Sequence, residues 1–197
     1  MKKAIIILST ILLMYSCDVF KQIGGAYNLS QCKYGYQSID NIQIAGVSLG
    51  KTKSVSIAEI ATLTTILAGG NMQNIPFSMV LNLDVENPNE SPAYLNGLEY
   101  MIELNDMEFT NGKLDTPISI EPGKTSTIPL SIGVDLKNLM NRYSKDKVSS
   151  EMSRFLGISP GQTKVTVKLR PKILIGDVPL TSPAYIPVTF LFGGNKR

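Results

Sequence analysis

From Phe77 onward, apolar residues alternate with polar ones in one segment after another, and this period of two restricts the fold more than any other feature. The alternating apolar positions are Met79, Leu81, Leu83 and Val85; Leu98, Tyr100, Ile102 and Leu104; Ile128, Leu130, Ile132 and Val134; and Val165, Val167 and Leu169. Successive side chains of a strand point to opposite faces, so each segment predicts a half-buried β-strand. Because turn residues separate these segments, the pattern predicts a mostly β, antiparallel sandwich of two sheets.

Two other segments have helical spacing. The stretch from Ile57 to Ala68 follows a Ser-x-x-Glu capping box and predicts a short helix before the strand that ends at Asn-Pro-Asn. A helical insertion is expected near residues 136–156. Its apolar residues are Leu136, Leu139, Met140, Tyr143, Val148, Met152 and Phe155. They are too many for a plain connection, so we expect them either to close one end of the sandwich or to face a partner.

The N-terminus has the features of an export signal. Lys2 and Lys3 precede an uncharged, Ile- and Leu-rich run over residues 4–14, which is too short to span a membrane. The run ends at Ser16-Cys17, which resembles a bacterial lipoprotein signal in which the Cys becomes the acylated first residue. The alternative is an ordinary secretory signal followed by a coincidental cysteine. We expect lipidation at Cys17, and attachment to a membrane through it.

The rest of the chain divides as follows. Residues 1–16 are the expected signal peptide, 17–36 a tether rich in Gly, Asn, Gln and Ser, 37–193 one β-sandwich domain that begins with a strand over 39–49, and 194–197 a tail. Without the signal peptide, 17 basic residues stand against 16 acidic ones. A net charge of +1 predicts no nucleic-acid partner and no electrostatic attachment to a membrane.

Composition also excludes several kinds of chemistry. The chain has no His and only two Cys, so His-based nucleophilic catalysis and His-ligated zinc are ruled out. Cys32 is expected to be an inert free thiol, the alternative being an intermolecular disulfide. No phosphate-binding loop follows the Gly pairs. We therefore predict no enzyme activity, no catalytic residue, no metal and no cofactor.

Acidic side chains allow one metal hypothesis. Asp84, Glu86, Glu99 and Glu103 would offer hard oxygen ligands to Ca²⁺. The simpler interpretation is that outward acids on one strand pair with Lys164, Lys168 and Arg170 on a neighbouring strand. No Asp-x-Asp loop accompanies the acids, so cross-strand pairing is favoured.

One stretch resembles a known family. The segments concerned are Leu83–Asn89, Leu95–Leu104, Thr116–Ile118, Pro122–Thr125 and Ile128–Leu130. In this order they resemble the type 2 late embryogenesis abundant family, also called the water stress and hypersensitive response domain. The resemblance implies an Ig-like or fibronectin-like sandwich without catalytic residues. Pro88 would end its strand, and Asn87 and Asn89 would cap backbone groups, so this motif is expected to be structural.

These observations predict a lipid-anchored protein of the bacterial cell envelope. Its non-catalytic β-sandwich would have a structural or stress-protective, desiccation-related role, as the resemblance implies. The alternative is a specific binding module, or one subunit of an envelope assembly, that contacts an envelope protein through the 136–156 insertion. Which membrane and which leaflet hold the protein stay open.

Overall fold

The computed structural model describes residues 23–49, 57–68, 72–175 and 178–193, and β-strands form most of it. The first larger sheet has the strand order β2-β1-β3-β8. Its strands are β1 (Lys33–Ile44), β2 (Val47–Ser48), β3 (Pro76–Glu86) and β8 (Thr125–Asp135). All neighbouring strands in it are antiparallel.

The second larger sheet has the order β10-β9-β5-β6, and β11 also pairs with β9. Its strands are β5 (Gly97–Leu104), β6 (Met107–Leu114), β9 (Gln162–Ile175), β10 (Val178–Thr181) and β11 (Ile186–Gly193). A small third sheet pairs β4 (Ala93–Leu95) with β7 (Ile118–Ile120). These pairs are antiparallel as well.

The two larger sheets pack against each other through the alternating apolar residues. Leu81 and Leu83 of β3, Ile102 of β5 and Val167 of β9 are fully buried. Phe77 of β3 meets Phe109 of β6 edge to face, with ring centroids 5.6 Å apart. The predicted inward faces of β3, β5, β8 and β9 are therefore confirmed.

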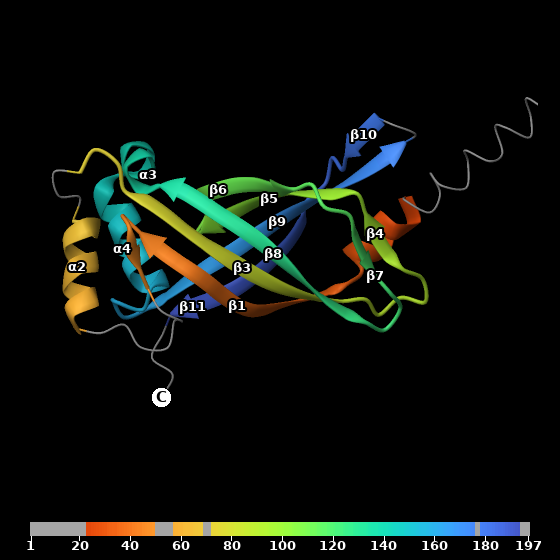
Figure 1. The fold of residues 1–197 in the computed structure, drawn as a ribbon, viewed down its shortest axis with the longest axis horizontal. Helices are drawn as coiled ribbons and strands as arrows, with labels where there is room; N and C mark the ends of the chain where they lie inside the picture. Colours follow the sequence, from red (N-terminus) through yellow and green to blue (C-terminus); the bar gives the residue numbers. More distant parts are fainter. Residues whose placement is uncertain (1–22, 50–56, 69–71, 176–177, 194–197) are drawn as a thin grey trace, which may run out of the picture.

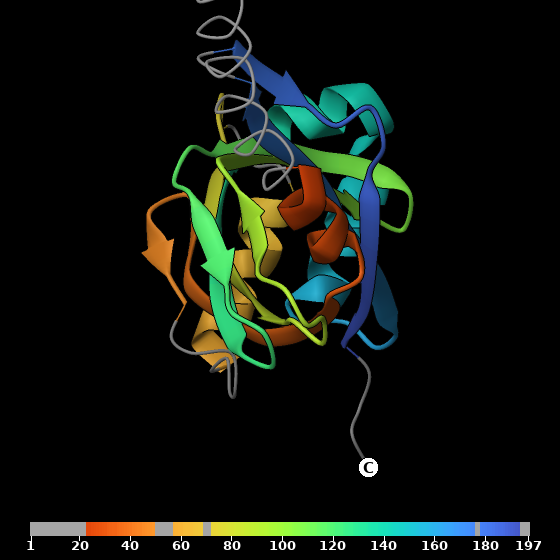
Figure 2. The same cartoon turned by 90° about the vertical axis from the view of Figure 1, so that its right-hand side faces the viewer.

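The helices lie at the two ends of this elongated layer (Figure 1). At one end are α2 (Ile57–Leu67), α3 (Leu136–Tyr143) and α4 (Lys145–Phe155). At the other end a helix over residues 23–30 lies beside β4 and β7. Figure 2 looks onto this second end and shows that helix in front of the strands. In the part of the chain that is described, no helix has the length and apolar character to cross a membrane.

The helical insertion closes one end of the sandwich. Leu136, Val148 and Met152 are fully buried, and Leu139, Met140 and Phe155 are nearly so. Asp135 caps α3 by accepting a hydrogen bond from the Lys137 amide at 2.9 Å, and it also accepts from the Ile75 amide at 2.9 Å. The closing role is thus the one that the structure supports.

The fold begins earlier than the sequence pattern predicts. The composition of residues 17–36 predicts a tether, but residues 33–36 pair with β3 from Lys33↔Glu86 to Tyr36↔Leu83, and residues 23–30 are helical. Gly and polar residues are compatible with this strand because its partner supplies the backbone hydrogen bonds. The tether assignment is corrected for residues 23–36; residues 17–22, the signal peptide, Cys17 and the tail lie outside the described residues.

Strand β6 is, like helix 23–30, an element that the sequence pattern does not predict. It follows β5 through a two-residue turn at Asn105 and Asp106, whose φ angles are 45° and 63°. Such left-handed pairs form the tight turns that suit the twist of a hairpin. Only Met107, Phe109 and Thr110 of β6 are buried, so its alternation is short.

Tyr100 of β5 links the second larger sheet to β8, which is an edge strand of the first. Its ring lies over Gly112, which is opposite it on β6, and its hydroxyl donates to the Ser131 carbonyl of β8. Thr110 likewise donates to the Gly133 carbonyl at 3.2 Å. These bonds occupy carbonyls on the free edge of β8. Pro129 leaves this edge with one backbone N–H donor fewer, because proline has no amide hydrogen.

We expect Gly112→Ala to lower the free energy of unfolding by about 1–3 kcal/mol, because the added methyl group would overlap the Tyr100 ring. The matched control is Gly133→Ala, at a strand position with open space around it. That change should be neutral, or stabilising by up to about 1 kcal/mol. Denaturant unfolding followed by circular dichroism measures both. Equal effects would contradict the packing of Tyr100 on Gly112.

Candidate functional site

The Asn-Pro-Asn motif lies at the end where the chain enters the fold. Asn87 is fully buried, and its side-chain amide donates to the carbonyls of Ile120 at 2.8 Å and Ser91 at 3.0 Å. Its side-chain oxygen accepts from the backbone and side-chain amides of Asn89 at 3.0 and 2.7 Å. Its backbone bonds to Lys124 and Gly123 in the turn before β8. Every polar group of Asn87 is therefore in use.

Asn89 extends this network to the N-terminal helix. Its side-chain amide donates to the Asn28 carbonyl at 3.0 Å, and the Asn28 side chain donates to the Pro92 carbonyl at 3.0 Å. Gly25 packs so closely on Tyr94 of β4 that a Cβ there would lie 2.8 Å from the Cβ of Tyr94. The motif thus fastens helix 23–30 to the loop after β3.

Cys32 lies just after this helix and has little access to solvent. It is 8% exposed, and its Sγ lies 3.4 Å from the Asn28 carbonyl as a donor. Burial raises the pKa of its thiol, which keeps it in the unreactive protonated form. This geometry is that of an inert packed thiol.

The acidic residues proposed for Ca²⁺ lie in two different sheets. Glu103 of β5 accepts from Lys168 of β9 at 2.5 Å, and Glu99 lies 3.4 Å from Lys172. Glu86 of β3 pairs instead with Lys33 at 2.9 Å. Among the described residues no group of three or more acidic, Cys or His side chains could hold a metal ion. The structure therefore supports cross-strand pairing.

Glu151 is a buried acid that the sequence pattern does not single out. It is 7% exposed and accepts from Arg154 at 2.6 Å and from Asn105 at 2.6 Å. The Asn105 side-chain oxygen in turn accepts from the Lys164 amide at 3.0 Å. These bonds fasten α4 to the β5–β6 turn and to β9. The carboxylate of Glu151 is thus engaged by Arg154 and Asn105 within the fold. In the sequence, the one sign of this buried acid is a charged residue within the apolar stripe of the insertion.

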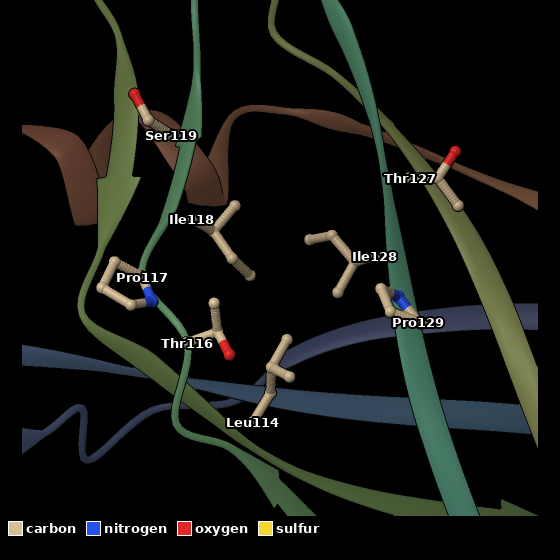
Figure 3. A pocket seen from close by; sticks show the side chains of 8 residues that line it. All are labelled: Leu114, Thr116, Pro117, Ile118, Ser119, Thr127, Ile128 and Pro129. Atoms are coloured by element: carbon tan, nitrogen blue, oxygen red, sulfur yellow. The ribbon is translucent and has the colours of Figure 1, made fainter.

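An open groove of about 320 Å³ lies between β8 and the segment that enters β7. Its lining residues are Leu114, Thr116, Pro117, Ile118, Ser119, Thr127, Ile128 and Pro129. In Figure 3 the side chains of Ile118 and Ile128 point toward each other across the groove, and Ser119 and Thr127 point away. No charged side chain lines it. The groove can therefore accept an apolar group, but its residues offer neither proton transfer nor metal ligation.

A smaller hollow of about 200 Å³ lies between β6 and α3. The Glu108 and Arg142 side chains on its wall are 3.9 Å apart, and Asp135 on the same wall is occupied as the cap of α3. The polar groups of this hollow are thus engaged with one another and with the backbone.

These elements define a mostly β protein built of antiparallel sheets with a few short helices. A family model described as late embryogenesis abundant protein matches residues 82–182. The chain belongs to this family, whose members are generally non-enzymatic.

Several solved structures are similar to this chain. A protein from Archaeoglobus fulgidus is 20% identical, with 64% of this chain and 91% of that chain covered and a TM-score of 0.38. A protein from Arabidopsis thaliana is 14% identical, with coverages of 60% and 69% and a TM-score of 0.35. A protein described as late embryogenesis abundant is 11% identical, with coverages of 95% and 88% and a TM-score of 0.35. A search of curated proteins gave no significant match.

We expect Asn87→Asp to destabilise the protein by about 2–4 kcal/mol although it preserves the shape of the side chain. The two donors would be replaced by an oxygen facing the buried carbonyls of Ile120 and Ser91. Chemical denaturation measures the change. The matched control is Asn111→Asp, an exposed position, where we expect less than about 0.5 kcal/mol. A small effect at Asn87 would argue against a structural role for the motif.

Alkaline pH should destabilise the fold through buried tyrosines. Burial raises the pKa of Tyr34 above its usual 10.0, and that of Tyr100 as well. Above pH 10 the tyrosines of the unfolded chain lose their protons before those of the folded protein do. The contribution of these tyrosines to the free energy of unfolding is therefore complete below pH 10 and falls as pH rises above it. In denaturant unfolding between pH 8 and 11, Tyr34→Phe should reduce this fall.

The same substitution removes the Tyr34 bond to the Leu29 carbonyl (2.8 Å), at a cost of about 0.5–1.5 kcal/mol at neutral pH. Tyr27→Phe is the control, because that ring is 66% exposed. An unchanged alkaline slope in Tyr34→Phe would show that this tyrosine is not responsible.

Proposed function

We propose that this chain is a lipid-anchored protein of the bacterial cell envelope whose β domain has a structural or stress-protective role without catalysis. The observation that carries the proposal is the order of the N-terminal features: two lysines, an uncharged run over residues 4–14, and Ser16-Cys17. Only five residues separate Cys17 from Ile23, the first described residue. An anchor at Cys17 would therefore hold the domain close to a membrane.

Family membership and the described side chains support the non-catalytic part of the proposal. Asn87 and Glu151 are buried polar residues at the two ends of the fold, and both form hydrogen bonds with other residues of the domain. The outward charges of β5 bond to those of β9. A stress-protective role comes to this chain through the family, whose name refers to late embryogenesis.

The strand order supports an Ig-like or fibronectin-like arrangement within this domain. The run β1-β3-β8 has the order of strands A, B and E of such sandwiches, and β11-β9-β5-β6 has the order of G, F, C and C′. In both patterns the third, fifth and sixth strands along the main path lie in the sheet opposite to the strand before them. We infer the same architecture here, with α3 and α4 inserted between the equivalents of E and F.

The alternative function is a binding module that contacts an envelope protein through the 136–156 insertion. The apolar residues on which it depended, including Leu139, Met140 and Met152, are buried in the protein itself. A partner at this end would have to bind the polar outer faces of α3 and α4. The anchored, non-catalytic domain is therefore the function that we favour.

Acylation is tested by metabolic labelling of cells with a fatty-acid analogue. We expect the wild-type chain to take up label and to fractionate with membranes, and Cys17→Ala to lose both properties. Cys32→Ala is the matched control, because it removes the other cysteine of the chain and should keep the label. Label on Cys17→Ala, or a wild-type protein found free of membranes, would contradict the anchor.

A further inference from the structure

The end of strand β9 continues beyond the sheet as a two-stranded ribbon. The pairing of β5 with β9 begins at Gly97↔Lys172, and the pairing of β11 with β9 covers Gln162 to Leu169. Residues 173–175 therefore pair only with residues 178–180 of β10. We call these six residues the apolar hairpin; Figure 1 shows it projecting from the body of the molecule.

All six residues of the apolar hairpin are apolar in type. Its residues are Ile173, Leu174, Ile175, Val178, Pro179 and Leu180. A ribbon exposed to water on one side normally alternates apolar and polar residues. Here Val178 is 60% exposed and Leu180 is 45% exposed. A two-stranded hairpin is also marginal in water on its own, so this surface is suited to being covered.

Further exposed apolar side chains lie at the same end. Tyr27 is 66% and Ile23 48% exposed, both on helix 23–30. This helix packs on β4 through Gly25 and Tyr94, and Asn96, directly after β4, donates its backbone amide to the Lys172 carbonyl at the base of the hairpin. Helix and hairpin therefore flank one end of the sandwich, opposite to α2, α3 and α4 (Figures 1 and 2).

The position of the chain entry selects the occupant. If Cys17 is acylated, as the proposed function has it, five residues connect it to Ile23, and the distance from Cys17 to Ile23 is at most about 20 Å. The anchor would thus hold this end, and not the end with α2–α4, next to the lipid headgroups. Exposed Tyr side chains such as Tyr27 favour that interfacial region.

The charges near the hairpin base do not require an anionic surface. Lys172 lies 3.4 Å from Glu99 and 3.5 Å from Asp115. Arg170 bonds to Tyr185 at 3.3 Å and stacks over its ring at 5.1 Å. Since these cations have partners, contact with lipid would depend on apolar burial rather than on counter-charges.

We propose that the apolar hairpin and the exposed face of helix 23–30 dock on the lipid bilayer that holds the acyl anchor. This inference rests on the proposed function and adds the docking surface and the orientation: the hairpin end faces the bilayer and the end with α2–α4 faces away.

The absence of tryptophan from the chain allows a direct test with the full-length acylated protein. Val178→Trp is reconstituted in zwitterionic phosphatidylcholine vesicles whose acyl chains are brominated near the headgroup. We expect fluorescence to fall at least twofold relative to unbrominated vesicles, with little change between low and high salt. The control is Leu191→Trp, whose position is 64% exposed on β11, near α4 and away from the hairpin. It should be quenched little.

A second reporter tests the surface without altering the anchor. Tyr27→Trp should be quenched in the same vesicles, and adding Val178→Asp and Leu180→Asp should abolish most of that quenching while the protein still floats with the vesicles. Circular dichroism checks that this variant is folded. If it is not, the Val178→Trp and Leu191→Trp pair decides.

Each failure has its own signature. Protein that floats with the vesicles but shows equal quenching at positions 178 and 191 overturns the docking surface and leaves the anchor intact. If the fluorescence of Val178→Trp changes only as protein concentration rises, and crosslinking gives dimers, then the hairpin docks on a second copy of the chain and lipid docking is overturned. Wild-type protein that does not float refutes the proposed anchor, and the orientation is refuted with it.

Discussion

Alternating side chains along most of β3 and β5, in the middle of β8 and over residues 163–171 of β9 are buried between the two larger sheets, and the other parts of the molecule are arranged around that layer. A layer of this kind leaves strand edges and two open ends, where backbone groups and apolar side chains would meet water. Tyr100 and Thr110 use their hydroxyls to occupy carbonyls along the edge of β8. This edge is thus closed by side chains of the opposite sheet rather than by another strand.

The two ends are closed by different means. At one end the apolar sides of α2, α3 and α4 cover the core, and the buried Glu151 fastens α4 to the β5–β6 turn and β9. At the other end the described residues form one helix, over 23–30, and the amide of Asn87 links the β3 end, the β7 end and the turn before β8. A short amide suits this place because it satisfies buried donors and acceptors together without introducing a charge.

The sequence predicts the long strands and the helices α2, α3 and α4 well, because their apolar residues repeat over several turns or pleats, but it does not predict helix 23–30. It does not predict β6, whose alternation is brief, nor the first residues of β1, whose Gly and polar residues resemble a tether but pair with β3. Within the candidate site, the capping role of Asn87 follows from its residue type. The partners of Asn87, the Tyr100–Gly112 contact and the Glu151 network come from segments distant in sequence, so no local pattern can indicate them.

The difference between the two ends has a functional consequence if the chain is anchored. At the end with α2–α4, the apolar sides of α3 and α4 are buried and polar side chains such as Lys145 and Lys147 are exposed. Leu191 of β11 is an exposed apolar side chain near α4, and single residues of this kind are common on surfaces that face water. The hairpin end combines exposed apolar residues with the entry point of the chain. In a protein free in solution, such a surface would stay in contact with water and would favour association with other copies of the chain. A protein held by lipid at that end covers the surface without a second partner, so the position of the anchor and that of the apolar residues support the same orientation.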